Sequence, residues 1–153
     1  MDIWFFHLAR QPLERALPNL LEQSLRKNWR AVVQARDDER LAALDATLWT
    51  YADDSFLAHG MARDGDAELQ PVYLTTGAET PNAAAARFFV YGAEIEDFLA
   101  VPGADAYQRL VLMFNGEDAD ELAGARAQWK KLKERGHALQ YWRQGDNGWE
   151  KVA

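Results

Sequence analysis

Short apolar runs alternate with segments of helical spacing along most of the chain. The apolar runs predict strands at 3–8, 30–35, 71–75, 87–91, 109–114, 138–143 and 149–152. Leucines and alanines at helical spacing predict helices at 13–25, 37–49 and 117–136, with a helical turn at 95–99. Strands that alternate with helices predict a three-layer α/β fold, in which helices flank a mainly parallel sheet. We expect residues 1–153 to form a single domain.

The segment 117–136 has the most regular helical pattern. Its apolar positions recur three and four residues apart, so they lie on one face of a helix. They are Leu122, Ala125, Trp129 and Leu132. Acidic residues open the segment and basic residues close it, as the helix dipole favours, and Gly136 is a typical stop. We therefore predict an amphipathic helix whose apolar face carries Trp129.

A basic stripe runs beside that apolar face. Arg126, Lys130 and Lys133 share one side of the predicted helix. Cations that edge an apolar groove suit a peptide end that is both acidic and hydrophobic. The alternative is a solvated helix face whose charges only answer the helix dipole. From this pattern alone the solvated face is the favoured interpretation.

The composition narrows the possible functions. The 153 residues are 48% hydrophobic and 27% charged, which is typical of a chain that folds. A formal net charge of −7 argues against the protein as a whole gripping a nucleic-acid backbone. The chain has no cysteine, which excludes disulfides and thiolate sites and fits a cytoplasmic protein. We see no apolar stretch of membrane-spanning length or signal-peptide form, and expect no contact with membranes.

Residues for catalysis or phosphate binding are missing from the expected places. In parallel α/β folds a nucleotide phosphate commonly sits in a glycine-rich turn after the first strand. Here that turn is 9–12, Ala-Arg-Gln-Pro, and no G-x-G-x-x-G or G-K-[ST] motif occurs. The three histidines are far apart in the sequence, and His7 is predicted to be a core residue. We expect a Rossmann-like fold without a phosphate-binding loop, with no cofactor and no metal.

The segment 48–60, LWTYADDSFLAHG, is unusually aromatic. It covers the end of the helix 37–49 and the start of a long loop predicted at 50–69. Its large apolar residues are Trp49, Tyr51, Phe56 and Leu57. Such a segment either packs its aromatic rings against the domain or offers them to a partner. The residues alone do not choose between the two.

The order and spacing of several motifs resemble the chi subunit of bacterial DNA polymerase III holoenzyme. The resemblance runs along nearly the whole chain. It is carried by LERALP at 13–18, LDATLWTYADDSFLAHG at 44–60, QPV at 70–72, PN at 81–82, FNG at 114–116, AR at 125–126, WK at 129–130 and YW at 141–142. Two positions depart from the family pattern: Ala58 stands where proline is usual, and Asn115 where aspartate is frequent. Neither touches the contact residues that the resemblance implies.

The resemblance implies a non-catalytic accessory subunit of the clamp-loader assembly in DNA replication. In that family, chi joins the psi subunit to the C-terminal tail of single-stranded DNA-binding protein. The tail is acidic and ends in an aromatic residue with a free carboxylate. By position, Arg126 and Lys130 would meet carboxylates and Trp129 would line the pocket for the last ring, with Lys133 beside them. Leu122 stands where the family site can have a basic residue.

The same resemblance assigns the aromatic segment to a second partner. Trp49 and Phe56, with the neighbouring Leu57, match positions that the family uses to hold psi, or a helicase that competes with psi.

Two other functions compete with this adaptor role. A small nucleotide- or nucleic-acid-processing enzyme on the same Rossmann-like fold is disfavoured by the missing phosphate loop and catalytic groups. Direct binding of single-stranded DNA needs aromatic residues interleaved with cations. From the sequence only Trp129 has such neighbours, while Trp4, Trp29 and Trp49 fall in or beside core elements. We therefore expect DNA to be contacted only indirectly.

Overall fold

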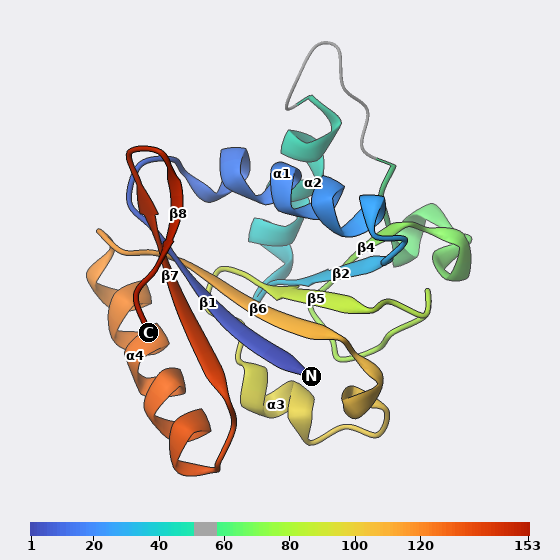
Figure 1. The fold of residues 1–153 in the computed structure, drawn as a ribbon. Helices are drawn as coiled ribbons and strands as arrows, with labels where there is room; N and C mark the ends of the chain where they lie inside the picture. The colour runs from blue at the N-terminus through green and yellow to red at the C-terminus, as the bar shows by residue number, and fades with distance from the viewer. Residues whose placement is uncertain (51–57) are drawn as a thin grey trace.

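The computed structural model describes residues 1–50 and 58–153 as a sheet with helices on both faces (Figure 1). Its strands are β1 (Asp2–Leu8), β2 (Ala31–Gln34), β3 (Gly60–Met61), β4 (Val72–Thr75), β5 (Ala86–Phe89), β6 (Arg109–Asn115), β7 (Leu139–Gly145) and β8 (Gly148–Lys151). Its helices are α1 (Leu13–Arg26), α2 (Asp38–Trp49), α3 (Ile95–Leu99) and α4 (Ala119–Glu134). Short 3-10 turns lie at η1 (Ala62–Asp64), η2 (Ala67–Leu69) and η3 (Ala104–Ala106).

The strands form one sheet in the order β3-β4-β2-β5-β6-β1-β7-β8. Neighbouring strands are parallel except in the closing β7–β8 hairpin. Strands of a parallel sheet are covered on both faces, which explains why β1 and β6 are nearly continuous apolar runs. The predicted three-layer α/β fold with a mainly parallel sheet is therefore confirmed.

Alternate residues of β1 supply two separate cores. Phe6 and Leu8 pack with leucines of α1 and α2 on one face of the sheet. Ile3 and Phe5 pack with residues of α3 and α4 on the other face. Figure 1 shows α1 and α2 on one side of the strands and α3 and α4 on the other. The last helix and the aromatic end of α2 are thus separated by the sheet.

The helix starts follow the local signals of the sequence. Asp37 caps α2, because its carboxylate accepts a hydrogen bond from the Arg40 N–H at 2.8 Å. Asp118 caps α4 in the same way and accepts from the N–H groups of the second and third residues of the helix, at 3.0 Å each. Helix α1 begins at Leu13, and Pro18 lies buried inside it.

Two predicted boundaries were wrong. The described part of the long loop at 50–69 contains β3, η1 and η2. Strand β3 has only two residues, Gly60 and Met61, which is too short for any periodic pattern. Strand β5 ends at Phe89, and the chain turns away from the sheet at Tyr91 and Gly92, with φ of +51° and +86°. The apolar run at 87–91 therefore continues into a turn.

A buried arginine fastens the connection between β4 and β5. The Arg87 side chain is fully buried and donates to Gln34 Oε1 at 2.9 Å, Gly77 O at 2.8 Å, Glu79 O at 3.1 Å and Tyr107 Oη at 3.1 Å. Acceptors from three parts of the chain satisfy its N–H groups, because a buried guanidinium without hydrogen-bond partners is costly. Elsewhere, no helix within the two described ranges combines the length and apolar character needed to cross a bilayer.

Candidate peptide-binding site

The packing of helix α4 fixes its orientation about its own axis. Ala125 and Leu132 are buried against the sheet, and Leu122 and Trp129 are partly buried beside them, as the helical spacing predicts. Gln128 locks the helix further. Its side chain accepts a hydrogen bond from the Ile95 N–H at 3.0 Å and donates to the Ala93 carbonyl at 3.2 Å. These contacts fix which side of α4 faces solvent.

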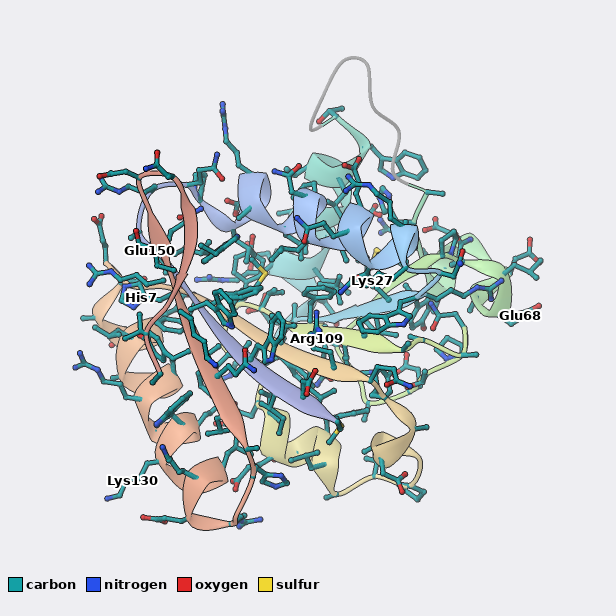
Figure 2. The ribbon with its side chains drawn as sticks, viewed as in Figure 1. His7, Lys27, Glu68, Arg109, Lys130 and Glu150 are labelled. Carbon is teal, nitrogen blue, oxygen red and sulfur yellow. The ribbon has the colours of Figure 1, made fainter. Side chains whose placement is uncertain are left out.

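The basic stripe of α4 faces solvent as predicted. Arg126, Lys130 and Lys133 are exposed, and Figure 2 shows Lys130 projecting away from the sheet. Across residues 1–50 and 58–153, none of the three forms an ion pair with a carboxylate. Arg135, at the end of the helix, is paired with Glu96 at 3.0 Å. The three cations of the stripe therefore remain available to an external anion.

Trp129 forms the apolar border of this stripe. Its ring meets the ring of Phe5 edge-on at a centroid distance of 5.2 Å and that of Tyr141 at 5.6 Å. Lys133 Nζ lies 5.4 Å from the Trp129 ring centroid. The indole is thus wedged between the sheet and the cations, with part of its surface exposed.

An aromatic cluster continues from Trp129 onto the sheet. His7 on β1 has Nδ1 2.7 Å from the Tyr141 hydroxyl, and its ring is 5.1 Å from the ring of Phe114. Gly116 is required beside it, because a side chain there would overlap the His7 ring. The register pairs Phe5 with Tyr141 and His7 with Arg143, so α4, β1 and β7 meet at one place.

Positive charge dominates this cluster. Burial lowers the pKa of His7, and the charges of Arg143 and Arg126 lower it further. Burial raises the pKa of Tyr141, although the same two arginines oppose that rise. His7 and Tyr141 are therefore neutral at pH 7, and two guanidinium groups lie within electrostatic reach of both. An entering carboxylate would meet these two guanidinium groups; the nearest acid by strand register is Glu150 of β8, which is paired with Arg143 but forms no ion pair with it in the described residues.

Four members of the cluster were not assigned to the site from the sequence: His7, Phe114, Tyr141 and Arg143. His7 was expected to be a core residue, but it is only partly buried and borders the basic stripe. The parallel pairing of β1 with β6 and β7 brings these residues together over long sequence separations. Only the alternation within 139–143, which places Tyr141 and Arg143 on one face, pointed to them.

The second set of predicted contact residues lies on the other side of the sheet. Trp49 ends α2 with 49% of its surface exposed, and its ring centroid is 4.3 Å from that of His59. His59 is buried, with Nε2 3.1 Å from Asp45 Oδ1. Phe56 and Leu57 lie outside the described residues. The structure therefore does not join Trp49 to the site on α4.

The turn after β1 is closed by one of the protein's own side chains. The backbone N–H groups of Ala9, Arg10 and Gln11 all point at Gln144 Oε1, at 3.1, 2.9 and 2.9 Å. In nucleotide-binding relatives of this architecture, such converging N–H groups hold a phosphate. Here the β7–β8 hairpin supplies a neutral oxygen in that position. Three backbone donors of this glycine-free turn are thus satisfied within the protein and need no bound phosphate.

A crevice at the carboxyl ends of the strands is acidic. It encloses about 400 Å³ between the starts of α2 and α4. Its carboxylates outnumber its two guanidinium groups; they belong to Asp37, Glu94, Asp118, Asp120 and Glu121. Burial raises the pKa of Glu121, which is partly buried while the other four carboxylates are exposed. Such a lining repels phosphate, and in the described residues no three acidic or histidine side chains are grouped to hold a metal.

These features define a class of protein: a parallel α/β domain with a closed phosphate position and a cationic, aromatic helix face that fits a binding role. Comparison with known proteins gives the particular family. The family model of the DNA polymerase III chi subunit, HolC, matches residues 1–140, and the chain belongs to this family. Over 96 residues it is 27% identical to a probable DNA polymerase III subunit chi of Rickettsia prowazekii (strain Madrid E). That match covers 63% of this chain and 58% of the relative.

Removal of the Gln144 side chain tests the closed turn. Gln144→Ala leaves three N–H groups without their shared acceptor, and water replaces it only in part. We expect the free energy of unfolding to fall by about 1–2 kcal/mol. Urea denaturation measures the loss. Gln108→Ala, which removes an exposed side chain, is the matched control and should change stability by less than about 0.5 kcal/mol. Equal urea midpoints for the two variants would contradict the stabilising role of Gln144 in the turn after β1.

Proposed function

We propose that this protein is a non-catalytic accessory subunit of a DNA polymerase III assembly. It links the clamp loader, through a psi-type subunit, to the acidic C-terminal tail of single-stranded DNA-binding protein. The observation that carries this proposal is the unpaired basic stripe of α4 along the aromatic cluster of Trp129, Tyr141 and His7. Family membership supports the same role.

The chemistry of the tail matches the side chains of this site. The terminal aromatic ring of the tail would pack against Trp129 and Tyr141, which lie side by side, either edge-on or stacked. Its carboxylate lies within reach of guanidinium groups, which bind carboxylates in a planar, two-bonded geometry. Upstream acidic residues would then pass along Lys130 and Lys133, which are exposed on the same side of α4. Ring, carboxylate and acidic chain are each matched by a separate part of the surface.

The enzyme alternative has less support. The phosphate position after β1 is filled by Gln144, and the crevice beside it is acidic. His7, which lies in the proposed site, bonds to a tyrosine rather than to a carboxylate or a nucleophile. These contacts favour a binding surface over a catalytic centre.

The second proposed contact is with psi, or with a helicase that competes for the same place. Trp49 is half exposed at the end of α2, where a large indole is a common anchor of protein interfaces. The ring contact with the buried His59 limits its motion before a partner binds. Phe56 and Leu57 are part of this proposal by position in the sequence. The adaptor would thus hold its two partners on opposite faces of the sheet.

Titration with a short acidic peptide that ends in an aromatic residue tests the tail site. The peptide buries little area and loses conformational freedom, so we expect a dissociation constant on the order of micromolar. Arg126→Ala should weaken binding about tenfold or more, because a charged hydrogen-bonded contact is lost. Lys131→Ala is the matched control, since Lys131 is exposed but lies on another face of α4. It should change the affinity by less than about twofold.

Two further arms of the isothermal titration separate the site from a merely charged helix. A peptide without its last residue should lose most of its affinity, because it lacks the ring and moves the carboxylate. Binding of the full peptide should weaken as salt rises above the concentration at which the Debye length is about 10 Å. If the shortened peptide binds as well as the full one, or Lys131→Ala equals Arg126→Ala, the site is misplaced.

The affinity for the tail peptide should depend on pH through His7. The pKa of His7 is lowered in the free protein, so its ring is neutral at pH 7. A bound carboxylate favours the charged ring and raises that pKa, so binding takes up a proton. We therefore expect tighter binding as pH falls from about 8 to about 6, a window in which peptide carboxylates stay ionised.

His7→Gln is the control for the pH effect, because an amide can keep a hydrogen bond to Tyr141 but cannot titrate. Its peptide affinity should be nearly independent of pH over the same range. Isothermal titration at several pH values measures both proteins. The same pH slope in wild type and His7→Gln would contradict a role for His7.

A further inference from the structure

The face of the sheet opposite α4 carries a second aromatic and basic surface. We call it the tryptophan face; it comprises Trp4, Trp29, Trp142 and Trp149 with Lys27, Arg109 and Lys151. It lies between the end of α1 and the β7–β8 hairpin, and Figure 2 labels Lys27 at the end of α1 and Arg109 at the start of β6. The expectation that only Trp129 has basic neighbours was wrong.

Cations and indoles alternate across one side of this face. Lys27 Nζ is 4.9 Å from the ring centroid of Trp29, and Arg109 Cζ is 5.2 Å from the same ring. Arg109 Cζ is also 3.6 Å from the ring centroid of Trp4. The Trp4 ring is in turn 5.5 Å from that of Trp142. Arg109 thus contacts the rings of both Trp4 and Trp29, and the ring of Trp142 packs directly beside that of Trp4.

The β7–β8 hairpin adds further residues to the tryptophan face. Trp142 is paired with Lys151, and Gln144 with Trp149, in the antiparallel register of β7 and β8. Paired residues point to the same side of a sheet, so Lys151 and Trp149 lie on this face with Trp142. The Trp149 ring stacks on Phe6 at 4.5 Å, with an angle of 21° between the planes.

The face keeps its aromatic surface partly open to solvent. All four tryptophans are partly exposed, and Lys27 and Lys151 are exposed. The indole N–H of Trp4 and the Nε–H of Arg109 are buried and have no hydrogen-bond partner within residues 1–50 and 58–153. Within the described residues both donors therefore lie without acceptors beside a small groove of about 50 Å³, which is also lined by Gln23 of α1.

The charge of this face is opposite to that of the whole protein. Three cations stand against Asp2, which lies 3.6 Å from Arg109, while the chain carries a net charge of −7. A local basic surface on an acidic protein draws polyanions to that one place. Flat indoles between the cations then select for an anion that carries planar rings.

We propose that the tryptophan face binds single-stranded nucleic acid, with bases against the indoles and phosphates against Lys27, Arg109 and Lys151. Unpaired bases stack on aromatic side chains, and nearby cations follow the backbone. A duplex hides its base faces and gains only from the three cations. This inference goes beyond the adaptor role, in which DNA is reached through another protein. It also uses Trp142, Trp149 and Lys151, which lie beyond the residues that the family model matches.

Fluorescence anisotropy of a labelled twelve-residue oligothymidylate tests the proposal. At low salt the full chain should bind it with a dissociation constant between about 10⁻⁵ and 10⁻⁴ M, typical of non-specific contacts. The logarithm of the affinity should fall with the logarithm of salt concentration with a slope of about −2, as three cations on a single strand predict. A duplex of the same length should bind at least about tenfold more weakly.

Two double variants with the same change of charge locate the site. Lys27→Glu with Lys151→Glu should weaken oligonucleotide binding at least about tenfold while leaving the tail peptide titration unchanged. Lys130→Glu with Lys131→Glu changes α4, on the other face of the sheet. This variant should weaken binding of the tail peptide and leave binding of the oligonucleotide unchanged. All four lysines are exposed, so both variants should fold. Trp149→Leu should weaken binding of the oligonucleotide without changing the slope of affinity against salt concentration. Circular dichroism checks that this variant is folded.

Several results would overturn the proposal. They are the absence of binding at about 200 µM protein in low salt, equal affinity for the duplex, and equal losses in the two double variants. Displacement of the oligonucleotide by the tail peptide would also overturn it, because the oligonucleotide would then occupy the site on α4. Loss of peptide binding with oligonucleotide binding intact would count against the adaptor role alone.

Discussion

The parallel pairing of β1 with β6 on one edge and β7 on the other underlies both surfaces of the molecule. In a strand, successive side chains point to opposite faces. Phe5 and His7 therefore reach the cluster under α4, while Trp4 and Phe6 reach the tryptophan face. A register slip of one residue would exchange the two sets and destroy both surfaces. Burial on both faces of the sheet holds this register in place.

The two surfaces share a physical design but differ in their aromatic geometry. On α4, the Trp129 ring is held edge-on against Phe5 and Tyr141, which leaves a border suited to one terminal ring. On the tryptophan face, Arg109 bridges Trp4 and Trp29 in a row suited to several successive rings. The carboxyl ends of the strands, where parallel α/β proteins often bind nucleotides, are instead closed by Gln144 and lined with carboxylates. The two binding sites that we propose lie instead on the two faces of the sheet.

The sequence was most informative where the physics is local. Spacing within 117–136 predicted α4, its buried side and its exposed cations, and the leucine spacing at 37–49 predicted α2. Local patterns say little about contacts made by pairing distant strands, so His7, Tyr141 and Arg143 were not assigned to the site. The same limit concealed the closure of the β1 turn, because Gln144 is 133 to 135 residues from the groups it satisfies. A two-residue strand such as β3 leaves no pattern at all.

The central role that we propose for the cluster around Trp129 is to receive the end of an acidic tail. Nuclear magnetic resonance of the six indole N–H signals tests this directly, because every tryptophan lies in a described part of the chain. On addition of an acidic peptide with a terminal aromatic residue, the Trp129 signal should shift with saturation. The signals of the other five tryptophans should stay in place. A Trp129 signal that does not move, or a saturable shift at Trp49 or on the tryptophan face instead, would contradict the account.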